Sequence, residues 1–197
     1  MKALADFILS RQSEIYPEPI SEGHSMITAA MAREVVKYLP AGASVLDIGC
    51  GQGPALEWFR QEGFDAMGTT MSLVDAMELE KKGLRWVRAD MHEPVNDGHP
   101  VDCIWARHVL EHSIAPMFAL HQWRAMLKDG GILYVEVPGE GTSCQHHTNP
   151  NHYSIFTGQV WRELIERSGF AILEARNINL ETGAGPDVYH SFICRKQ

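Results

Sequence analysis

The sequence feature that most constrains the fold is an alternation of short apolar runs with helical or loop segments between residues 44 and 138. Five apolar runs occur in this region: SVLDI, FDAMGT, LRWVRA, VDCIWA and GILYVEVP. Strands that alternate with helices are joined by right-handed crossovers, so this order predicts a mostly parallel sheet with helices on both faces. The last two apolar runs, FAILEARNINL and PDVYHSFICRK, are separated only by the turn-rich ETGAG. They predict a terminal antiparallel pair.

The segments between these runs carry signals for where helices start and stop. Apolar residues recur every four positions over residues 25–39 and Pro40 follows, which predicts a helix that ends there. Further helices are predicted over residues 54–62, 73–82, 116–128 and 158–168. Their terminal signals are Pro54 at a first helical position, Ser72 and Thr157 as N-caps, Lys128 at a C-terminus and Gly169 as a stop.

The length and composition fit one soluble domain. The 197 residues are 45% hydrophobic and 21% charged, which is typical of a globular chain with a sizeable core. We expect a single domain over residues 1–197, with an N-terminal helix and lid segment over 1–25 and the core over 26–197. No apolar run is long enough to span a bilayer and no cleavage site follows the first helix. We therefore expect a cytoplasmic protein without membrane contact.

Charge and cysteine usage narrow the choice of partners. The net charge of -8 argues against a protein that binds by neutralising phosphates, so a small or neutral substrate is favoured over a nucleic acid. The four cysteines include no CxxC pair, which indicates neither a zinc ribbon nor a disulfide framework. They are Cys50, Cys103, Cys144 and Cys194.

A glycine-rich segment follows the first apolar run. Residues 47–53 read DIGCGQG, which is the pattern D-x-G-x-G-x-G. Glycines permit a tight turn and let a ligand lie against bare backbone. The spacing differs from G-x-G-x-x-G, so the version that cradles a pyrophosphate fits poorly. On this motif alone, a purely structural turn and a nucleotide-dependent oxidoreductase stay open as alternatives.

Three further segments follow in order: VRAD (87–90), VDCIWARHVLEH (101–112) and WRAMLKDGGILYVEVP (123–138). Together with VLDIGCGQG they closely resemble the class I S-adenosylmethionine-dependent methyltransferases. The narrower resemblance is to their small-molecule group, which carries LEH after the fourth strand and an LKPGG turn before the fifth. Asp129 replaces the proline of that turn here. The resemblance implies an α/β, Rossmann-like, doubly wound sheet of seven strands, six parallel and one antiparallel, and S-adenosyl-L-methionine as cofactor.

The resemblance also implies cofactor-binding roles at matching positions. Asp47 would hold the methionine end of the cofactor, which carries an ammonium and lies near the sulfonium. Asp90 would accept a hydrogen bond from the adenine amino group, and Met91 would lie against the ring. Ala106 and Arg107 would line the methionine portion. The glycine-rich turn would contribute backbone contacts from Gly49, Cys50, Gly51 and Gly53.

The sequence departs from the family at the end of the second apolar run. Family members usually place an Asp or Glu there to receive the ribose diol, but GTTMS aligns Thr70 with that position. A neutral hydroxyl forms a weaker hydrogen bond, so cofactor binding should be weaker by about 1–2 kcal/mol unless the lid or a neighbouring side chain compensates. Neither nearby acid is expected to substitute, because Asp65 precedes the strand and Asp75 lies inside the next helix.

The chain contains 10 histidines, and several fall where a general base is useful. His108 follows the fourth apolar run, and His152 lies in the long loop EGTSCQHHTNPNHYSIF (140–156), which lies over the methyl side of the cofactor in this fold. We predict these two as candidate bases, with loop anchoring as the alternative for His152. His112 of LEH is expected to fix the loop by hydrogen bonds.

The same loop does not predict a metal site. Its metal-ligating side chains lack the usual zinc spacing. They are Cys144, His146, His147 and His152.

Together these features predict an S-adenosylmethionine-dependent methyltransferase that acts on a small molecule or a sugar- or lipid-linked precursor, at oxygen. One alternative is a catalytically inactive S-adenosylmethionine-binding protein, with Thr70 as the first sign of lost function. The other is an RNA methyltransferase, against which the acidic charge counts.

Overall fold

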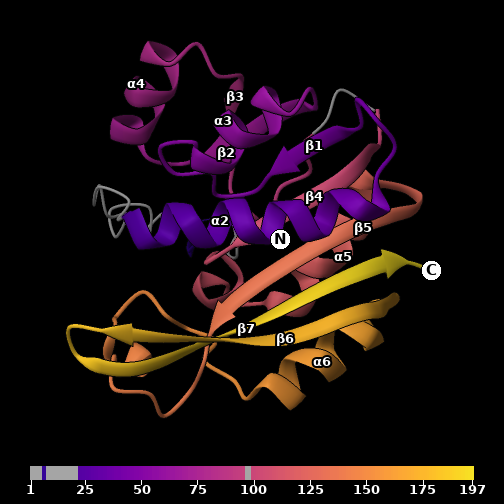
Figure 1. Ribbon diagram of the computed structural model, residues 1–197. Coiled ribbons are helices and arrows are strands. Elements are labelled where there is room, and N and C mark those ends of the chain that lie inside the picture. Colours follow the sequence, from indigo (N-terminus) through magenta and orange to yellow (C-terminus); the bar gives the residue numbers. More distant parts are fainter. Residues whose placement is uncertain (1–5, 8–21, 96–98) are drawn as a thin grey trace.

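The seven strands form one sheet with the order β3-β2-β1-β4-β5-β7-β6 (Figure 1). The structure is a computed structural model that describes residues 6–7, 22–95 and 99–197. The strands are β1 (Ser44–Asp47), β2 (Asp65–Thr70), β3 (Trp86–Arg88), β4 (Val101–Arg107), β5 (Leu127–Pro138), β6 (Phe170–Thr182) and β7 (Gly185–Lys196). Neighbours among β1 to β5 pair in parallel, whereas β7 pairs antiparallel with both β5 and β6. The prediction of six parallel strands and one antiparallel strand is therefore confirmed.

The helices lie between the strands in the predicted order. They are α2 (Glu22–Val35), α3 (Pro54–Gln61), α4 (Leu73–Lys81), α5 (Pro116–Met126) and α6 (Gly158–Arg167). A short 3-10 turn, η2 (Val36–Tyr38), extends α2 and ends before Pro40. The predicted N-terminal helix and lid lie almost entirely outside the described residues.

Local capping explains where the helices begin. The Ser72 hydroxyl accepts a hydrogen bond from the Asp75 amide, and the Thr157 hydroxyl accepts one from the Val160 amide, both at 3.1 Å. Each bond satisfies an amide that has no partner within its helix. Pro54 is the first residue of α3, where its missing N–H has no cost.

The predicted end of the helix before β5 is wrong. The helix α5 ends at Met126, and Lys128 belongs to β5. The reason is long-range pairing, because Leu127 pairs with Val101 of β4 and draws the chain into the sheet. The Lys128 ammonium then binds the Asp102 carboxylate at 2.8 Å instead of a helix terminus.

Helices cover both faces of the sheet, as predicted. In Figure 1, α2 crosses in front of the sheet and α5 lies behind it. Successive strand residues point to opposite faces, so Val45 and Trp105 pack with α2 and α3, whereas Leu46 and Ile104 pack with α5 and α6. Parallel strands place their carboxyl ends at one edge of such a sheet, where ligands bind.

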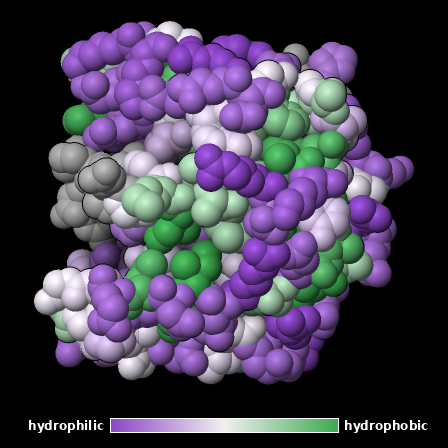
Figure 2. All heavy atoms as spheres, in the orientation of Figure 1, coloured by the Kyte–Doolittle hydropathy of each residue, from purple (hydrophilic) through white to green (hydrophobic). Residues whose placement is uncertain are grey.

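The outer surface is mainly polar on the face shown in Figure 2, where hydrophobic atoms gather in small separate patches. Among the described helices, none combines the length and the apolar character that crossing a membrane requires.

Gly68 of β2 is where the sheet touches the glycine-rich turn most closely. A Cβ atom at Gly68 would lie 2.5 Å from the Cys50 sulfur and 2.7 Å from Cδ1 of Leu56. We predict that Gly68→Ala lowers the free energy of unfolding by about 1–3 kcal/mol, the usual cost of overpacking, as measured by urea denaturation. Gly183→Ala is the control, because its added Cβ meets nothing within 4 Å. Equal stability of both variants would contradict the close packing of β2 against the turn.

Candidate functional site

The glycine-rich turn leaves β1 at the carboxyl edge of the sheet and exposes bare backbone. Gly49 and Gly51 have φ angles of 66° and 50°, which L side chains rarely adopt. A Cβ at Gly49 would lie 2.6 Å from Val109, so this glycine permits close packing. A Cβ at Gly51 would meet nothing within 4 Å. The turn is therefore open at Gly51, where a ligand can approach the backbone.

Asp47 ends β1 directly before this turn and is 3% exposed. Burial raises the pKa of its carboxyl well above the ordinary range, and the positive charge of Arg107 opposes that shift. A cationic ligand group nearby favours the charged carboxylate. Asp47 therefore suits a ligand with a positive charge at the start of the glycine-rich turn.

The two threonines at the end of β2 have different partners. The Thr69 hydroxyl accepts from the Gly49 amide, and the Thr70 hydroxyl accepts from the Ser72 amide, both at 3.1 Å. Thr69 therefore holds the glycine-rich turn. Thr70 keeps its own hydroxyl proton, which it can donate to a further group.

Asp75 lies closer to the turn than its position in the sequence indicates. It stands in the first turn of α4 and is 7% exposed. Burial raises the pKa of its carboxyl, while hydrogen bonds with Ser72 and Gln52 lower it. Its charge also contributes to the raised pKa of the buried Cys50 thiol, after burial and Asp47. Asp75 lies inside the helix, as predicted, and its hydrogen bond with Gln52 brings its carboxyl to the glycine-rich turn.

Asp90 follows β3 and is held in place by a histidine that the sequence analysis did not single out. Its Oδ1 accepts from the His92 amide at 2.9 Å and lies 2.6 Å from Nδ1 of the His92 ring. The other ring nitrogen lies 2.7 Å from the Ser113 hydroxyl. The neighbouring Met91 carbonyl accepts from the Trp123 indole at 2.8 Å. Hydrogen bonds therefore hold the side chain of Asp90 and the backbone of Met91, the two residues predicted to contact adenine.

A buried charge network lies where β4 and β5 end. Ala106 is fully buried, and the guanidinium of Arg107 lies 2.6 Å from the Glu136 carboxylate. Glu136 has no exposed surface, and its second oxygen accepts from Tyr134 at 2.5 Å. Burial alone would raise the pKa of Glu136, but His108 and Arg107 lower it. Glu136 was missed by sequence analysis because it lies within an apolar run.

His108 lies between two buried carboxylates. Its Nε2 is 3.2 Å from Glu136, and its Nδ1 is 3.4 Å from Glu111. Burial disfavours the imidazolium, but the two carboxylates outweigh burial and raise the pKa of His108. A protonated ring cannot accept a proton, so this environment does not favour His108 as a general base.

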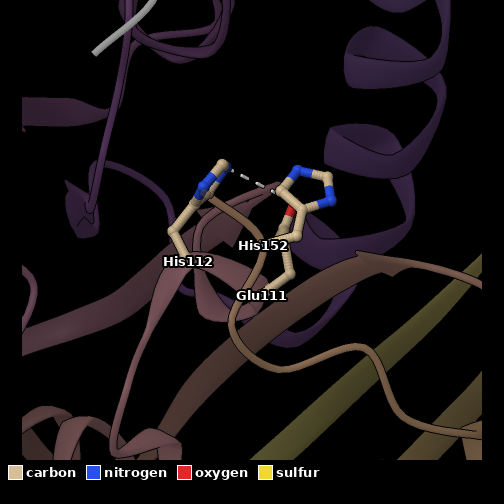
Figure 3. A group of neighbouring side chains, drawn as sticks. All are labelled: Glu111, His112 and His152. Atoms are coloured by element: carbon tan, nitrogen blue, oxygen red, sulfur yellow. Dashed lines mark ion pairs between the residues drawn. The ribbon is translucent and has the colours of Figure 1, made fainter. Parts of the chain in front are cut away.

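Glu111, His112 and His152 form a group at the end of β4 (Figure 3). Glu111 and His112 belong to η3 (Leu110–His112), and His152 comes from the loop after β5. One ligand atom from each residue lies within 4.8 Å of the others. The two imidazole rings are 4.7 Å apart, close to perpendicular. His112 makes the predicted contact to the loop, with Nδ1 2.9 Å from the Asn151 carbonyl.

The four loop side chains considered as a zinc set do not come together. His146 lies 3.0 Å from both carboxylate oxygens of Asp187, in a group that also contains Cys144. His147 is exposed. His152 joins Glu111 and His112 instead. Sequence spacing could not show either group, because each takes a member from a distant strand or turn.

Comparison with protein families identifies the chain. Residues 24–175 match a family described as a methyltransferase domain. The chain belongs to this methyltransferase family. The resemblance to class I S-adenosylmethionine-dependent methyltransferases is therefore confirmed, and with it the prediction that the chain is an enzyme. A comparison with curated proteins finds no significant match.

Solved structures share the fold of this methyltransferase at low sequence identity. The [4+2]-cyclase SpnF has a TM-score of 0.73 and 21% identity, over 88% of this chain and 80% of that one. A Burkholderia thailandensis 1,6-didemethyltoxoflavin-N1-methyltransferase, solved with its substrate and S-adenosylhomocysteine, has a TM-score of 0.71 and 20% identity, over 88% and 78%. A SAM-dependent methyltransferase from Archaeoglobus fulgidus has a TM-score of 0.69 and 20% identity, over 87% and 94%.

The charge on His108 should stabilise this methyltransferase in a pH-dependent way. Because its folded-state pKa is raised above 6.5, its stabilisation is complete below that pH and disappears as the pH rises through the folded-state pKa. We predict that His108→Asn costs about 1 kcal/mol more at about pH 5.5 than at about pH 9, the scale of a hydrogen bond to a charged group. Asparagine tolerates the φ of 54°, and urea denaturation at both pH values gives the difference.

The exposed His121 provides the control, since His121→Asn should cost the same at both pH values. If His108→Asn also costs the same at both, His108 stabilises the fold by packing, such as its 4.4 Å ring contact with Tyr189, and not by charge.

Proposed function

We propose that this methyltransferase transfers the methyl group of S-adenosylmethionine to an oxygen of a small molecule, or of a sugar- or lipid-linked precursor. The observation that carries the proposal is the open backbone of the turn at Gly51, together with the buried carboxyl of Asp47 directly before the same turn. When bound, the cofactor supplies an electrophilic methyl group on a positively charged sulfur. A buried carboxyl beside bare backbone suits such a cation.

The cofactor is proposed to lie along the carboxyl ends of β1, β2, β3 and β4. Asp47 would hold its cationic methionine end, and Asp90, fixed by His92, would accept from the adenine amino group. Met91 would lie against the adenine ring. The further contacts are proposed for Gly49, Cys50, Gly51, Gly53, Ala106 and Arg107.

The ribose is proposed to lie against Thr70. Because the Thr70 oxygen already accepts from Ser72, the residue has its hydroxyl proton to donate. The buried carboxyl of Asp75 supplies a second polar group near the turn. This pair would replace the single acid that other members carry at the end of β2.

On the acceptor side, His152 suits the role of general base better than His108. Its Nδ1 lies 3.0 Å from the His146 carbonyl, which places the proton on Nδ1 and leaves Nε2 as an acceptor. Burial lowers its pKa, so the ring is neutral near pH 7. In the transfer step, the acceptor oxygen bonds to the methyl carbon and its proton passes to Nε2. The electron pair of the broken carbon–sulfur bond stays on sulfur.

A second candidate is a protein that binds the cofactor without transferring its methyl group. Thr70 in place of an acid favours this candidate. So does the solved [4+2]-cyclase, since a shared fold does not fix the reaction. An RNA methyltransferase is a weaker candidate, because the net charge of -8 disfavours binding to phosphates.

Calorimetric titration followed by turnover assays separates these candidates. We expect S-adenosylmethionine to bind and S-adenosylhomocysteine to be released when a hydroxyl-bearing acceptor from a broad panel is present. Binding with no release across the panel favours the non-transferring protein. Salt-sensitive retention on RNA favours the RNA methyltransferase. Absence of binding at millimolar cofactor would falsify the proposal.

The role of Thr70 predicts the effect of restoring an acid. Thr70→Asp should tighten S-adenosylmethionine binding by about five- to tenfold, because a charged acceptor forms a stronger hydrogen bond to a ribose hydroxyl. Thr70→Val keeps the side-chain shape without the hydroxyl and should weaken binding. Calorimetry of both variants gives the dissociation constants. If Thr70→Asp weakens binding, another group, of which Asp75 is the nearest acid in the sequence, already occupies the ribose edge.

A further inference from the structure

Glu111 is a buried carboxylate whose oxygens lack hydrogen bonds. It is 1% exposed, and within the described part of the chain neither oxygen has a hydrogen-bond partner. Buried ionised groups are normally paired and hydrogen-bonded, or bind a metal. Two histidine rings, His108 and His112, lie beside this carboxylate. Its oxygens still have acceptor capacity left over.

The nearby histidines do not use that capacity through hydrogen bonds. His108 lies 3.4 Å away, and it also faces Glu136 at 3.2 Å. His112 places its Nε2 3.9 Å from the same carboxylate. These distances are those of ion pairs, which balance charge without filling the oxygen lone pairs.

Both His112 and His152 are oriented as metal ligands usually are. A ligating histidine donates its second ring N–H to a carbonyl or carboxylate, which fixes the tautomer and the orientation of the ring. Nδ1 of His112 lies 2.9 Å from the Asn151 carbonyl, and Nδ1 of His152 lies 3.0 Å from the His146 carbonyl.

The loop is held firmly above Glu111. The Ser154 amide donates to the Glu111 carbonyl at 2.9 Å, and the Ser154 hydroxyl donates to the Ser113 carbonyl at 2.8 Å. With the His112 contact, three bonds fasten the loop to η3 on both sides of His152. Figure 3 shows the result, with the His112 and His152 rings close together and the Glu111 carboxylate beside them.

From these observations we propose that Glu111, His112 and His152 bind one divalent first-row cation such as Zn²⁺. Two imidazoles and one carboxylate are a ligand set that zinc uses at catalytic sites, with a fourth position open. Ligands around one tetrahedral zinc lie roughly 3.4 Å apart. The three groups, within 4.8 Å of one another, therefore need to close by at most about 1.4 Å, and the partly exposed His112 and His152 rings can make this movement by side-chain rotation.

The second group of metal-ligating side chains does not support the same proposal. His146 already lies at hydrogen-bond distance from both oxygens of Asp187, and the Cys144 sulfur lies 3.3 Å from the Thr182 hydroxyl. Its polar atoms have hydrogen-bond partners, whereas the Glu111 carboxylate oxygens have none among the residues that the structure describes.

The role of the cation rests on the proposed function. The open position would take the acceptor oxygen, whose pKa falls on binding a metal. The oxygen would then lose its proton to water and bond to the methyl carbon, while the carbon–sulfur pair stays on sulfur. His152 cannot bind the metal and accept a proton at the same time. The metal, and not Nε2 of His152, would then promote loss of the proton from the acceptor oxygen.

Calorimetric titration of the tag-free, chelator-treated enzyme with Zn²⁺ tests the site. We expect one zinc per chain with a dissociation constant of about micromolar or tighter, weakened at least tenfold by His152→Ala and by the volume-conserving Glu111→Gln. The control is His147→Ala, an exposed histidine in the same loop, which should bind zinc as the wild type does. Circular dichroism checks that each variant is folded. If Glu111→Gln does not fold, His112→Gln replaces it in the titration.

Absence of zinc binding at millimolar concentration overturns the site. Zinc binding that survives His152→Ala but is lost in His146→Ala also overturns it, in favour of the Cys144 group. S-adenosylmethionine is titrated into the same preparations. Cofactor binding without zinc binding refutes the metal site and leaves the proposed function intact. Zinc binding without cofactor binding supports the metal site and refutes the proposed function.

Discussion

The glycine-rich turn keeps its shape because β2 holds it from the side. The amide of Cys50 donates to the Thr69 carbonyl at 2.8 Å, and the amide of Gly49 donates to the hydroxyl of the same threonine at 3.1 Å. Thr69 itself is 1% exposed, and a buried polar group that loses its hydrogen bond costs more than one at the surface. One of the two threonines at the end of β2 therefore holds the turn. Only Thr70 remains to take the place of the missing acid.

The buried charged side chains at the ends of β4 and β5 also stabilise one another. Glu136 is buried between Arg107 and His108, and a buried charge that loses its partner is strongly destabilising. The φ of 54° at His108 turns the chain at the end of β4, where the ring lies between Glu136 and Glu111. A left-handed backbone costs energy in a residue with a side chain, and it persists where the surroundings fix it. Here the surroundings are two carboxylates.

Most of the fold could be predicted because its signals are local. The caps at Ser72 and Thr157 bond to amides three residues away, and the stop at Gly169 has the positive φ of 86° that ends helices. Lys128 could not be assigned correctly, because its place in β5 depends on Leu127 pairing with Val101, 26 residues earlier in the chain. Tertiary pairing overrides helical pattern at such positions.

In the candidate site, too, features that depend on local contacts could be predicted from the sequence, and features that depend on distant contacts could not. The glycine positions could be predicted from the sequence because a turn is a local structure. Glu136, in contrast, meets Arg107 only through the pairing of β4 with β5. His152 meets Glu111 because hydrogen bonds at Asn151 and Ser154 fasten the loop to η3. Solved structures with this fold include a cyclase and a methyltransferase at 21% and 20% identity. The sheet and turn alone cannot separate such reactions, so the loop contacts on the acceptor side must carry the difference.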